Sequence, residues 1–342
     1  MIVWIWKEHI TNAHNHVAPA DRASMPMTLD VEAFSFLHAA SKAMAAVEAA
    51  RQLGVFRRLA HGPADLPTLI ADCRMGRRGA LLLLTALANL GLVSVAADGV
   101  YHLTAPALIT ASAPEDHLAE LIRNDYTPRA GDTPAGAERL YPDIVAMLGV
   151  WFAPAAERAA TRLHTANLRV LDVGAGAAPW SLAFALRNPD CRVTAVDLPA
   201  VLAITRQCVI VAGCQAQYEY LAGDCFGIDW ENGTYDLAIA GNVCHLFDPA
   251  ANRRLLARLF QALRPGGRAL IFDFLPNDRL DGPRWIVLYA LGLFTRTNSG
   301  QVYPFPTYAS WLEETGFMDI ERIDLGAAPP ISMICARRPS GS

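Results

Sequence analysis

The sequence has few charged residues and lacks several patterns that would assign it to other protein classes. Charged residues make up 18% of its 342 residues, hydrophobic residues make up 53%, and the formal net charge is −4. This balance supports a large core, argues against disorder and leaves no overall basic field for nucleic acid. The longest apolar run, 79–92, is shorter than the roughly 20 residues that cross a bilayer. We therefore expect neither a nucleic-acid nor a membrane partner.

Paired-cysteine and secretion patterns are absent as well. The seven cysteines are odd in number and show no C-x-x-C spacing, which predicts reduced, buried thiols in a cytoplasmic protein. His14 and His16 lie in a polar, Asn-rich stretch, and we predict no metal site. Residues 1–27 lack the pattern of a signal peptide. We expect an extension there, which either precedes a natural start at Met25 or Met27 or packs on a partner subunit.

Residues 28–110 predict a mostly helical domain that ends in a hairpin. Apolar residues recur at helical spacing, and 92–104 alternate around an Asp-Gly turn, which is typical of a β-hairpin. The predicted helices are 29–53, 55–60, 65–71 and 78–90. Three helices and a hairpin indicate a winged helix, but its recognition helix at 79–92 is uncharged, whereas DNA binding needs donors and cations. We therefore predict a buried helix and a dimerisation domain.

Residues 111–165 predict a helical linker that covers a pocket. The expected helices are 117–123 and 137–152, the second broken near Pro142. Trp151 and Phe152 either cap that pocket or pack between helices.

Residues 166–342 alternate between strand and helix patterns. This alternation predicts an α/β domain with a Rossmann-like, doubly wound parallel sheet. The last two strands have too short a connection for a crossover helix, so they are expected to pair as an antiparallel hairpin. The predicted strands are 169–173, 191–196, 218–221, 235–240, 268–274, 318–324 and 331–336. The predicted helices are 179–186, 200–212, 249–263, 284–294 and 307–315.

Polar residues and glycines follow the predicted parallel strands, whose carboxyl ends form the ligand-binding edge of such sheets. Asp172-x-Gly174-x-Gly176 forms a tight turn that allows close approach of a ligand. Asp197 ends the second strand, where a carboxylate can accept both ribose hydroxyls, and Asp224 ends the third. Together these positions predict an adenosine-type cofactor.

Two further observations bear on this cofactor. Pro179 stands where a dinucleotide-binding turn would carry its third glycine, which favours a smaller ligand without phosphates. Asp197 could instead cap the helix that Leu198-Pro199 opens, and the two roles are compatible.

The sequence at this point resembles the class I S-adenosylmethionine-dependent methyltransferases. Over roughly 29–338 it is similar to the two-domain small-molecule O-methyltransferases, which include plant phenolic, hydroxyindole and bacterial natural-product enzymes. The resemblance rests on LGVFRRL, LANLGLV, VLDVGAGAAPW, VDLPAVL, GDCF, NVCHLFDPAANRRLL, LRPGGRALIFDF and YASWLEETGF.

The resemblance implies S-adenosyl-L-methionine as cofactor and S-adenosyl-L-homocysteine as product. Gly174 and Gly176 would approach the methionine moiety, Asp197 would hold the ribose, and 224–226 would face the adenine. The cofactor-binding residues expected in full are Asp172, Gly174, Gly176, Asp197, Leu198, Asp224, Cys225, Phe226 and Asn242. The N-terminal domain of this family dimerises, so a homodimer is expected.

His245 falls where the O-methyltransferases carry their general-base histidine. Histidine suits this role because its imidazole titrates near neutral pH. The family also places a glutamate before an aromatic residue, where this chain has Thr307 before Tyr308. A second acidic partner is expected between the fifth strand and the next helix, where Asp281 is the nearest candidate.

The expected reaction is methyl transfer to a hydroxyl of a small aromatic secondary metabolite. An aromatic lining suits a flat, apolar acceptor. The alternatives are a carbon or nitrogen acceptor, or a non-methylating reaction such as cyclisation or rearrangement. The residues expected to line the substrate pocket are Trp151, Phe152, Trp285, Tyr289, Phe294, Asn298 and Tyr303.

Overall fold

The chain folds into two compact units of different composition. The computed structural model describes residues 31–104, 118–125, 131–163, 167–327 and 329–340. The predictions for 1–27, including those for His14 and His16, lie outside these ranges. The α/β unit comprises Thr133–Asp273 and the chain from Tyr308 onward, and the helical unit comprises Ser35–Asp132 and Phe274–Thr307.

These units cut across the domain limits drawn from the sequence. The predicted limits 28–110, 111–165 and 166–342 are continuous along the chain and remain a prediction. The helical unit, in contrast, includes 274–307, because its helix α12 (Arg284–Phe294) contacts α5 (Arg77–Asn89).

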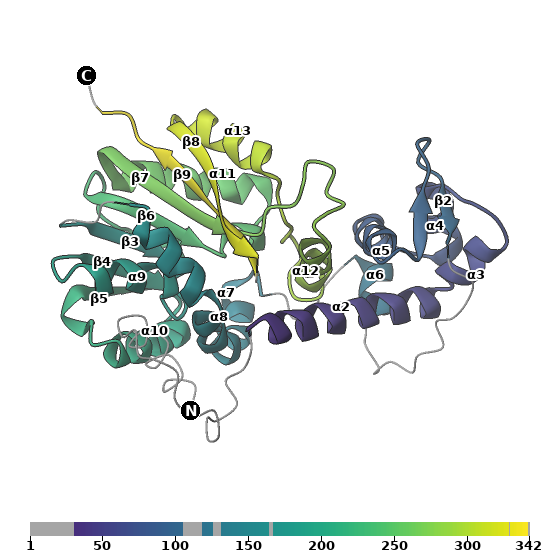
Figure 1. Ribbon diagram of the computed structural model, residues 1–342, viewed down its shortest axis with the longest axis horizontal. Helices are drawn as coiled ribbons and strands as arrows, with labels where there is room; N and C mark the ends of the chain where they lie inside the picture. The colour runs from purple at the N-terminus through teal and green to yellow at the C-terminus, as the bar shows by residue number, and fades with distance from the viewer. Residues whose placement is uncertain (1–30, 105–117, 126–130, 164–166, 328, 341–342) are drawn as a thin grey trace, which may run out of the picture. The chain divides into compact units, whose positions relative to one another are not determined.

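A seven-stranded sheet in the order β5-β4-β3-β6-β7-β9-β8 forms the α/β unit (Figure 1). Strands β3 to β7 run parallel, and β9 is antiparallel to both of its neighbours. This confirms the doubly wound sheet with a C-terminal hairpin. The strands are β3 (Arg169–Val173), β4 (Arg192–Asp197), β5 (Tyr218–Ala222), β6 (Tyr235–Gly241), β7 (Leu263–Asp273), β8 (Met318–Ala327) and β9 (Pro330–Arg337).

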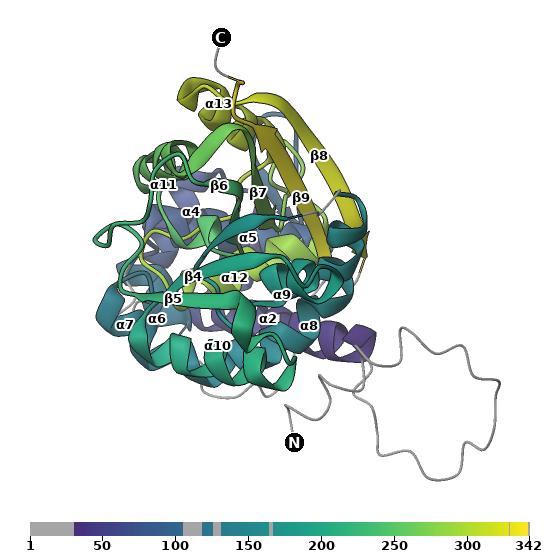
Figure 2. The same cartoon turned by 90° about the vertical axis from the view of Figure 1, so that its left-hand side faces the viewer.

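Helices cover both faces of this sheet. In Figures 1 and 2, α8, α9 and α10 lie on one side of the sheet, and α11 and α13 lie on the other. The helices are α7 (Pro134–Leu140), α8 (Pro142–Thr161), α9 (Pro179–Arg187), α10 (Pro199–Val211), α11 (Pro249–Ala262) and α13 (Phe305–Thr315), with short 3₁₀ turns at Gln215–Gln217 and Cys244–Leu246.

Strand β7 begins earlier than the sequence predicts. The sequence predicts a helix that ends at Leu263 and a strand that starts at Arg268. Instead Leu263 pairs with Tyr235, and the ladder shifts before Arg268 pairs with Leu237. An irregularity of this kind lets the glycines remain within a strand.

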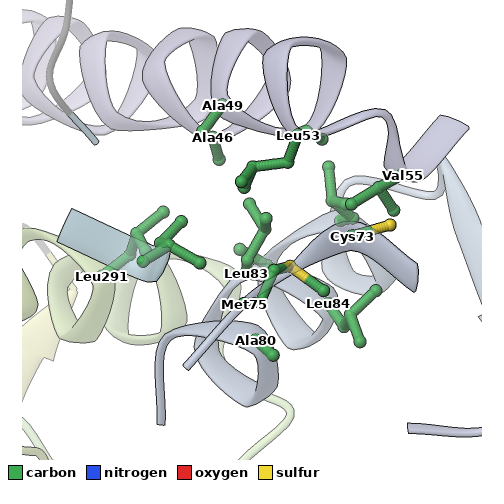
Figure 3. Packing of buried hydrophobic residues seen from close by; sticks show 14 of the residues in the cluster. Ala46, Ala49, Leu53, Val55, Cys73, Met75, Ala80, Leu83, Leu84 and Leu291 are labelled. Carbon is green, nitrogen blue, oxygen red and sulfur yellow. The ribbon is translucent and has the colours of Figure 1, made fainter. Parts of the chain in front are cut away.

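The helical unit contains the predicted helices and hairpin. Its helices are α2 (Val31–Leu53), α3 (Val55–Ala60), α4 (Leu66–Cys73), α5, α6 (Leu118–Asn124) and α12, and β1 (Val93–Val95) pairs with β2 (Tyr101–Leu103). Figure 3 shows Ala46 and Leu53 of α2 in one apolar cluster with Leu83 of α5 and Leu291 of α12. Within a single chain Leu81 of α5 is 48% exposed, so the predicted burial of this helix in a dimer contact stays a prediction.

No helix in the described ranges is both long and apolar enough to cross a membrane.

Candidate active site

The glycine turn after β3 has a backbone that only glycine adopts easily. Gly174 and Gly176 have φ values of 69° and 56°. The N–H groups of Gly174 and Ala175 donate to the Val196 carbonyl at 2.8 and 3.1 Å, which ties the turn to β4. A Cβ on Gly174 would lie 2.3 Å from Cγ2 of Val243, whereas a Cβ on Gly176 would meet nothing closer than 3.7 Å. The turn thus packs against the segment after β6 with no room for a side chain at Gly174.

Gly174→Ala is expected to destabilise the protein by about 2–4 kcal/mol, from left-handed backbone strain together with the clash at Val243. Gly176→Ala carries the strain alone and should cost about 1–2 kcal/mol. Denaturant unfolding of both variants and of Gly174→Ala/Val243→Ala measures the two contributions. Equal losses in the two single variants, with no recovery in the double variant, would show that the Val243 contact is unimportant.

Asp197, at the end of β4, joins the glycine turn to the next helix. Its Oδ2 accepts the Gly176 N–H and its Oδ1 accepts the Leu198 N–H, both at 2.8 Å. Burial raises the pKa of Asp197 to about 6, although both N–H bonds act to lower it. Helix α10 takes Leu198 as its N-cap without a side-chain cap. The carboxylate therefore organises the turn, and each oxygen keeps acceptor capacity for a ribose hydroxyl.

Asp172 belongs to a buried chain of hydrogen bonds. Tyr218 donates to Ser181 Oγ at 2.9 Å, and Ser181 donates to Asp172 Oδ2 at 2.5 Å. Burial raises the pKa of Asp172 to about 7. Its Oδ1 is also buried and has no hydrogen-bond partner among the described residues. Oδ1 therefore keeps its full acceptor capacity for the predicted role in cofactor binding.

The segment after β5 forms a compact loop at the same edge of the sheet. Asp224 Oδ1 accepts the Phe226 N–H at 3.0 Å, and the Phe226 ring packs edge-on to Phe247 at 5.0 Å. Arg258 of α11 donates to the carbonyl of Phe226 at 3.4 Å. Burial raises the pKa of Cys225 to about 12, so its thiol stays protonated at neutral pH. These contacts fix the loop that is predicted to face the adenine.

Asn242 follows β6 with a left-handed φ of 59°. Its N–H donates to the Phe272 carbonyl at 2.8 Å. Both polar atoms of its side chain are buried and have no partner in the part of the chain that the structure describes. Buried polar groups are almost always hydrogen-bonded, so this amide fits a polar ligand bound at the sheet edge.

His245 pairs with a buried carboxylate that the sequence analysis did not identify. It lies in the turn Cys244–Leu246, and its Nδ1 lies 2.6 Å from Asp273 Oδ1. Tyr308 donates to the other oxygen, Oδ2, at 2.7 Å. His245 and Asp273 are 3% and 1% exposed. The three residues come from the turn after β6, the end of β7 and α13.

Asp273, and not the candidate Asp281, is therefore the acidic residue that contacts His245. Asp281 is partly exposed, pairs with Arg279 at 2.8 Å and bonds to Asn277. The sequence carried a usable signal, since Asp273 interrupts the apolar run of β7 at the end where the neighbouring strands also end in polar residues. Thr307 stands at the position of the family's glutamate, and Tyr308, the next residue, contacts Asp273.

The predicted substrate-lining residues fall into two groups. Trp151 and Phe152 are buried in a stack, in which Phe152 lies 5.5 Å from Trp180 and Trp180 lies 3.9 Å from Phe272. This favours the packing alternative for both. The others belong to the helical unit, where Trp285 and Tyr289 stack at 5.3 Å and the remaining members are Phe294, Asn298 and Tyr303. Their contact with substrate stays a prediction.

Within the described ranges, no three His, Cys, Asp or Glu side chains gather to hold a metal ion.

Comparison with known proteins shows which proteins the chain resembles. A family described as "Methyltransferase domain" matches residues 170–267. The 3-hydroxy-5-methyl-1-naphthoate 3-O-methyltransferase of Streptomyces sahachiroi is 27% identical over 301 residues, which span 80% of this chain and 86% of that protein. The L-tyrosine C(3)-methyltransferase of Streptomyces lavendulae is 28% identical over 173 residues, which span 50% of this chain and 47% of that protein.

A solved structure shows the same fold along the chain. The O-methyltransferase family 2 protein from Planctomyces limnophilus, in complex with apigenin, has a TM-score of 0.71 at 24% identity and covers 94% of this chain and 100% of its own. The sheet order, the glycine turn and the acidic strand ends fit S-adenosyl-L-methionine as cofactor. Residues 170–267 thus match a methyltransferase domain, and the chain is an S-adenosyl-L-methionine-dependent methyltransferase whose relatives include small-molecule O-methyltransferases.

Proposed function

We propose that this enzyme methylates a hydroxyl of a small aromatic metabolite and that His245 removes the hydroxyl proton. The observation that carries the proposal is the His245–Asp273 pair. When Asp273 Oδ1 accepts a hydrogen bond from Nδ1, the proton of the neutral imidazole is held there and Nε2 keeps its lone pair. A base oriented by a carboxylate in this way can accept a proton from an acceptor hydroxyl.

S-adenosyl-L-methionine supplies an electrophilic methyl group when bound. The residues that would hold it are the glycine turn, Asp197, the 224–226 loop and Asn242. Their hydrogen bonds fix the backbone of the sheet edge in advance, and such preorganisation keeps donor and acceptor aligned for in-line transfer.

The aromatic acceptor is supported by the relative that methylates the 3-hydroxyl of a naphthoate. The test is formation of S-adenosyl-L-homocysteine with a panel of hydroxynaphthoates, hydroxyindoles and phenols. Each compound is paired with its O-methyl ether as control. Turnover with the hydroxy compounds and none with the ethers is expected, and equal turnover with both would contradict an oxygen acceptor.

Carbon methylation is the second candidate, because the tyrosine C(3)-methyltransferase matches half of this chain. The same panel separates the two activities. A phenol blocked at oxygen but open at the ortho carbon should be inert under the first proposal and methylated under the second.

Cofactor binding is expected to tighten as pH rises from 5 to 8. The pKa values of Asp197 and Asp172 are raised to about 6 and about 7, so both hold protons more firmly in the folded state than in the unfolded state. The stability that this proton binding contributes is therefore lost as pH rises from about 4, the usual pKa of aspartate, to about 6 for Asp197 and about 7 for Asp172. The ionised Asp197 is the better acceptor for ribose hydroxyls, so binding should release protons near pH 6.

Calorimetry with S-adenosyl-L-homocysteine in buffers of different ionisation enthalpy measures this proton release. Asp197→Asn is the matched variant and should lose the part that Asp197 contributes. An affinity that is flat from pH 5 to 8 would contradict the assignment of the ribose to Asp197.

The helical unit is proposed to be a winged-helix dimerisation domain. Its helices α3 to α5 precede the hairpin. Ala64, which lies before α4, forms an isolated antiparallel bridge with Tyr101 of β2. Met44 and Leu81 expose 41% and 48% of their surface on α2 and α5, which supports a contact with a second copy.

A further inference from the structure

We propose that Tyr308 is a positioning residue for the reaction, whose hydroxyl holds the Asp273 carboxylate and thereby keeps the proton of His245 on Nδ1. This inference deepens the proposed role of His245 and rests on it.

One buried carboxylate is shared between two side chains. Asp273 Oδ1 lies 2.6 Å from His245 Nδ1, and Oδ2 receives the Tyr308 hydroxyl at 2.7 Å. Tyr308 is completely buried and Asp273 is 1% exposed. Each carboxylate oxygen thus has a specific partner in a place remote from bulk water, where hydrogen bonds to a charged group are strongest.

Packing explains the ring of Tyr308 but not its hydroxyl. The ring lies edge-on to Trp311 at 5.6 Å, a contact that phenylalanine would make equally well. A buried hydroxyl costs free energy unless it is hydrogen-bonded. The bond from the Tyr308 hydroxyl to Asp273 Oδ2 meets this requirement.

The direction of the pH shift expected on loss of the Tyr308 hydroxyl follows from the negative charge of Asp273. A carboxylate that loses its Tyr308 donor is less stabilised, so the Asp273–His245 pair takes up a second proton more readily. In that state Nε2 carries a proton and cannot act as a base. The acid limb of the kcat–pH profile should therefore move to higher pH.

The experiment compares Tyr308→Phe with the unmodified enzyme at saturating cofactor and acceptor. We expect the acid limb of the kcat–pH profile to shift upward by about one pH unit, so that kcat falls about 10-fold on that limb, because a hydrogen bond to a charged group is lost. The loss should shrink as pH rises. A loss that is the same at every pH, or no loss, would overturn the proposal.

Tyr235→Phe is the matched control. Tyr235 is also a buried tyrosine of this sheet, and its hydroxyl donates to Thr194 at 3.3 Å near the start of β6. It lies at the opposite end of the strand from His245, so both kcat and the pH profile should stay unchanged.

A second readout is independent of turnover, and its first part uses only the unmodified protein. Nitrogen-15 NMR of histidine side chains, assigned with a His245 variant, should show an unprotonated Nε2 in the unmodified protein at pH 7.5. Tyr308→Phe should increase Nε2 protonation. A protonated Nε2 in the unmodified protein would overturn the role of Tyr308. If instead the tautomer shifts as expected while His245→Ala retains full activity, the positioning holds and the role of His245 as base fails.

Discussion

His245→Ala is expected to lower kcat by about 10²–10⁴-fold while leaving the affinity for S-adenosyl-L-homocysteine unchanged. General-base assistance contributes about this much, and alanine removes the only group that we assign to proton removal. His245 is buried in the turn after β6, so its loss also removes the imidazole partner of Asp273 Oδ1. Rapid-quench measurement of a single turnover isolates the transfer step from product release.

Two carboxylate variants sharpen this result. Asp273→Asn should reduce kcat by about 10²-fold or more, since the amide cannot hold the imidazole proton on Nδ1 as a carboxylate does. Asp281→Asn is the matched control, because Asp281 pairs with Arg279 and is partly exposed. If Asp281→Asn lost as much activity as Asp273→Asn, the role of Asp273 as the acidic partner of His245 would be wrong.

Asp197→Ala is expected to weaken S-adenosyl-L-homocysteine binding by about 10²–10³-fold. Hydrogen bonds from two ribose hydroxyls to a carboxylate are worth about 1.5–3 kcal/mol each, and part of this is retained through water in the variant. The variant also releases the N–H groups of Gly176 and Leu198 from their acceptor. Calorimetry gives the affinity, and thermal unfolding gives the stability.

Asp248→Ala separates the cofactor role of Asp197 from a capping role. Asp248 is the N-cap of α11 and accepts the Ala251 N–H at 2.7 Å, and such caps are worth about 1 kcal/mol. Asp197→Ala should lose a comparable amount of stability but far more affinity. Complete unfolding of Asp197→Ala, with Asp248→Ala folded, would favour the structural role.

The fold followed from local pattern because each parallel strand is a short apolar run between turn signals. Helix α12 was predicted with its observed bounds, since Pro283 precedes it and an apolar run fills it. Strand β7 was predicted less well. Its first residues include Pro265 and two glycines, and only pairing with β6 shows that they belong to the ladder. Tertiary contacts override local propensity in such cases.

The residues of the candidate site that lie at strand ends were predictable from the sequence. The contacts between their side chains were not. Strand ends identify Asp197 and His245 because parallel strands end at a common edge. The pairing of His245 with Asp273 joins residues 28 positions apart, and that of Asp273 with Tyr308 joins residues 35 apart. Nothing in the local sequence of α13 indicates that the Tyr308 hydroxyl is directed at β7.

The most direct test of the account is the fate of the methyl group itself. S-adenosyl-L-methionine labelled with carbon-13 in its methyl group is incubated with the enzyme and a hydroxy compound that gave turnover in the panel. The product is then identified by NMR. If His245 is the base for an oxygen acceptor, we expect a labelled methyl ether whose formation falls about 10²–10⁴-fold in His245→Ala. A methyl group on a ring carbon, or an equal yield of the ether from His245→Ala, would contradict it.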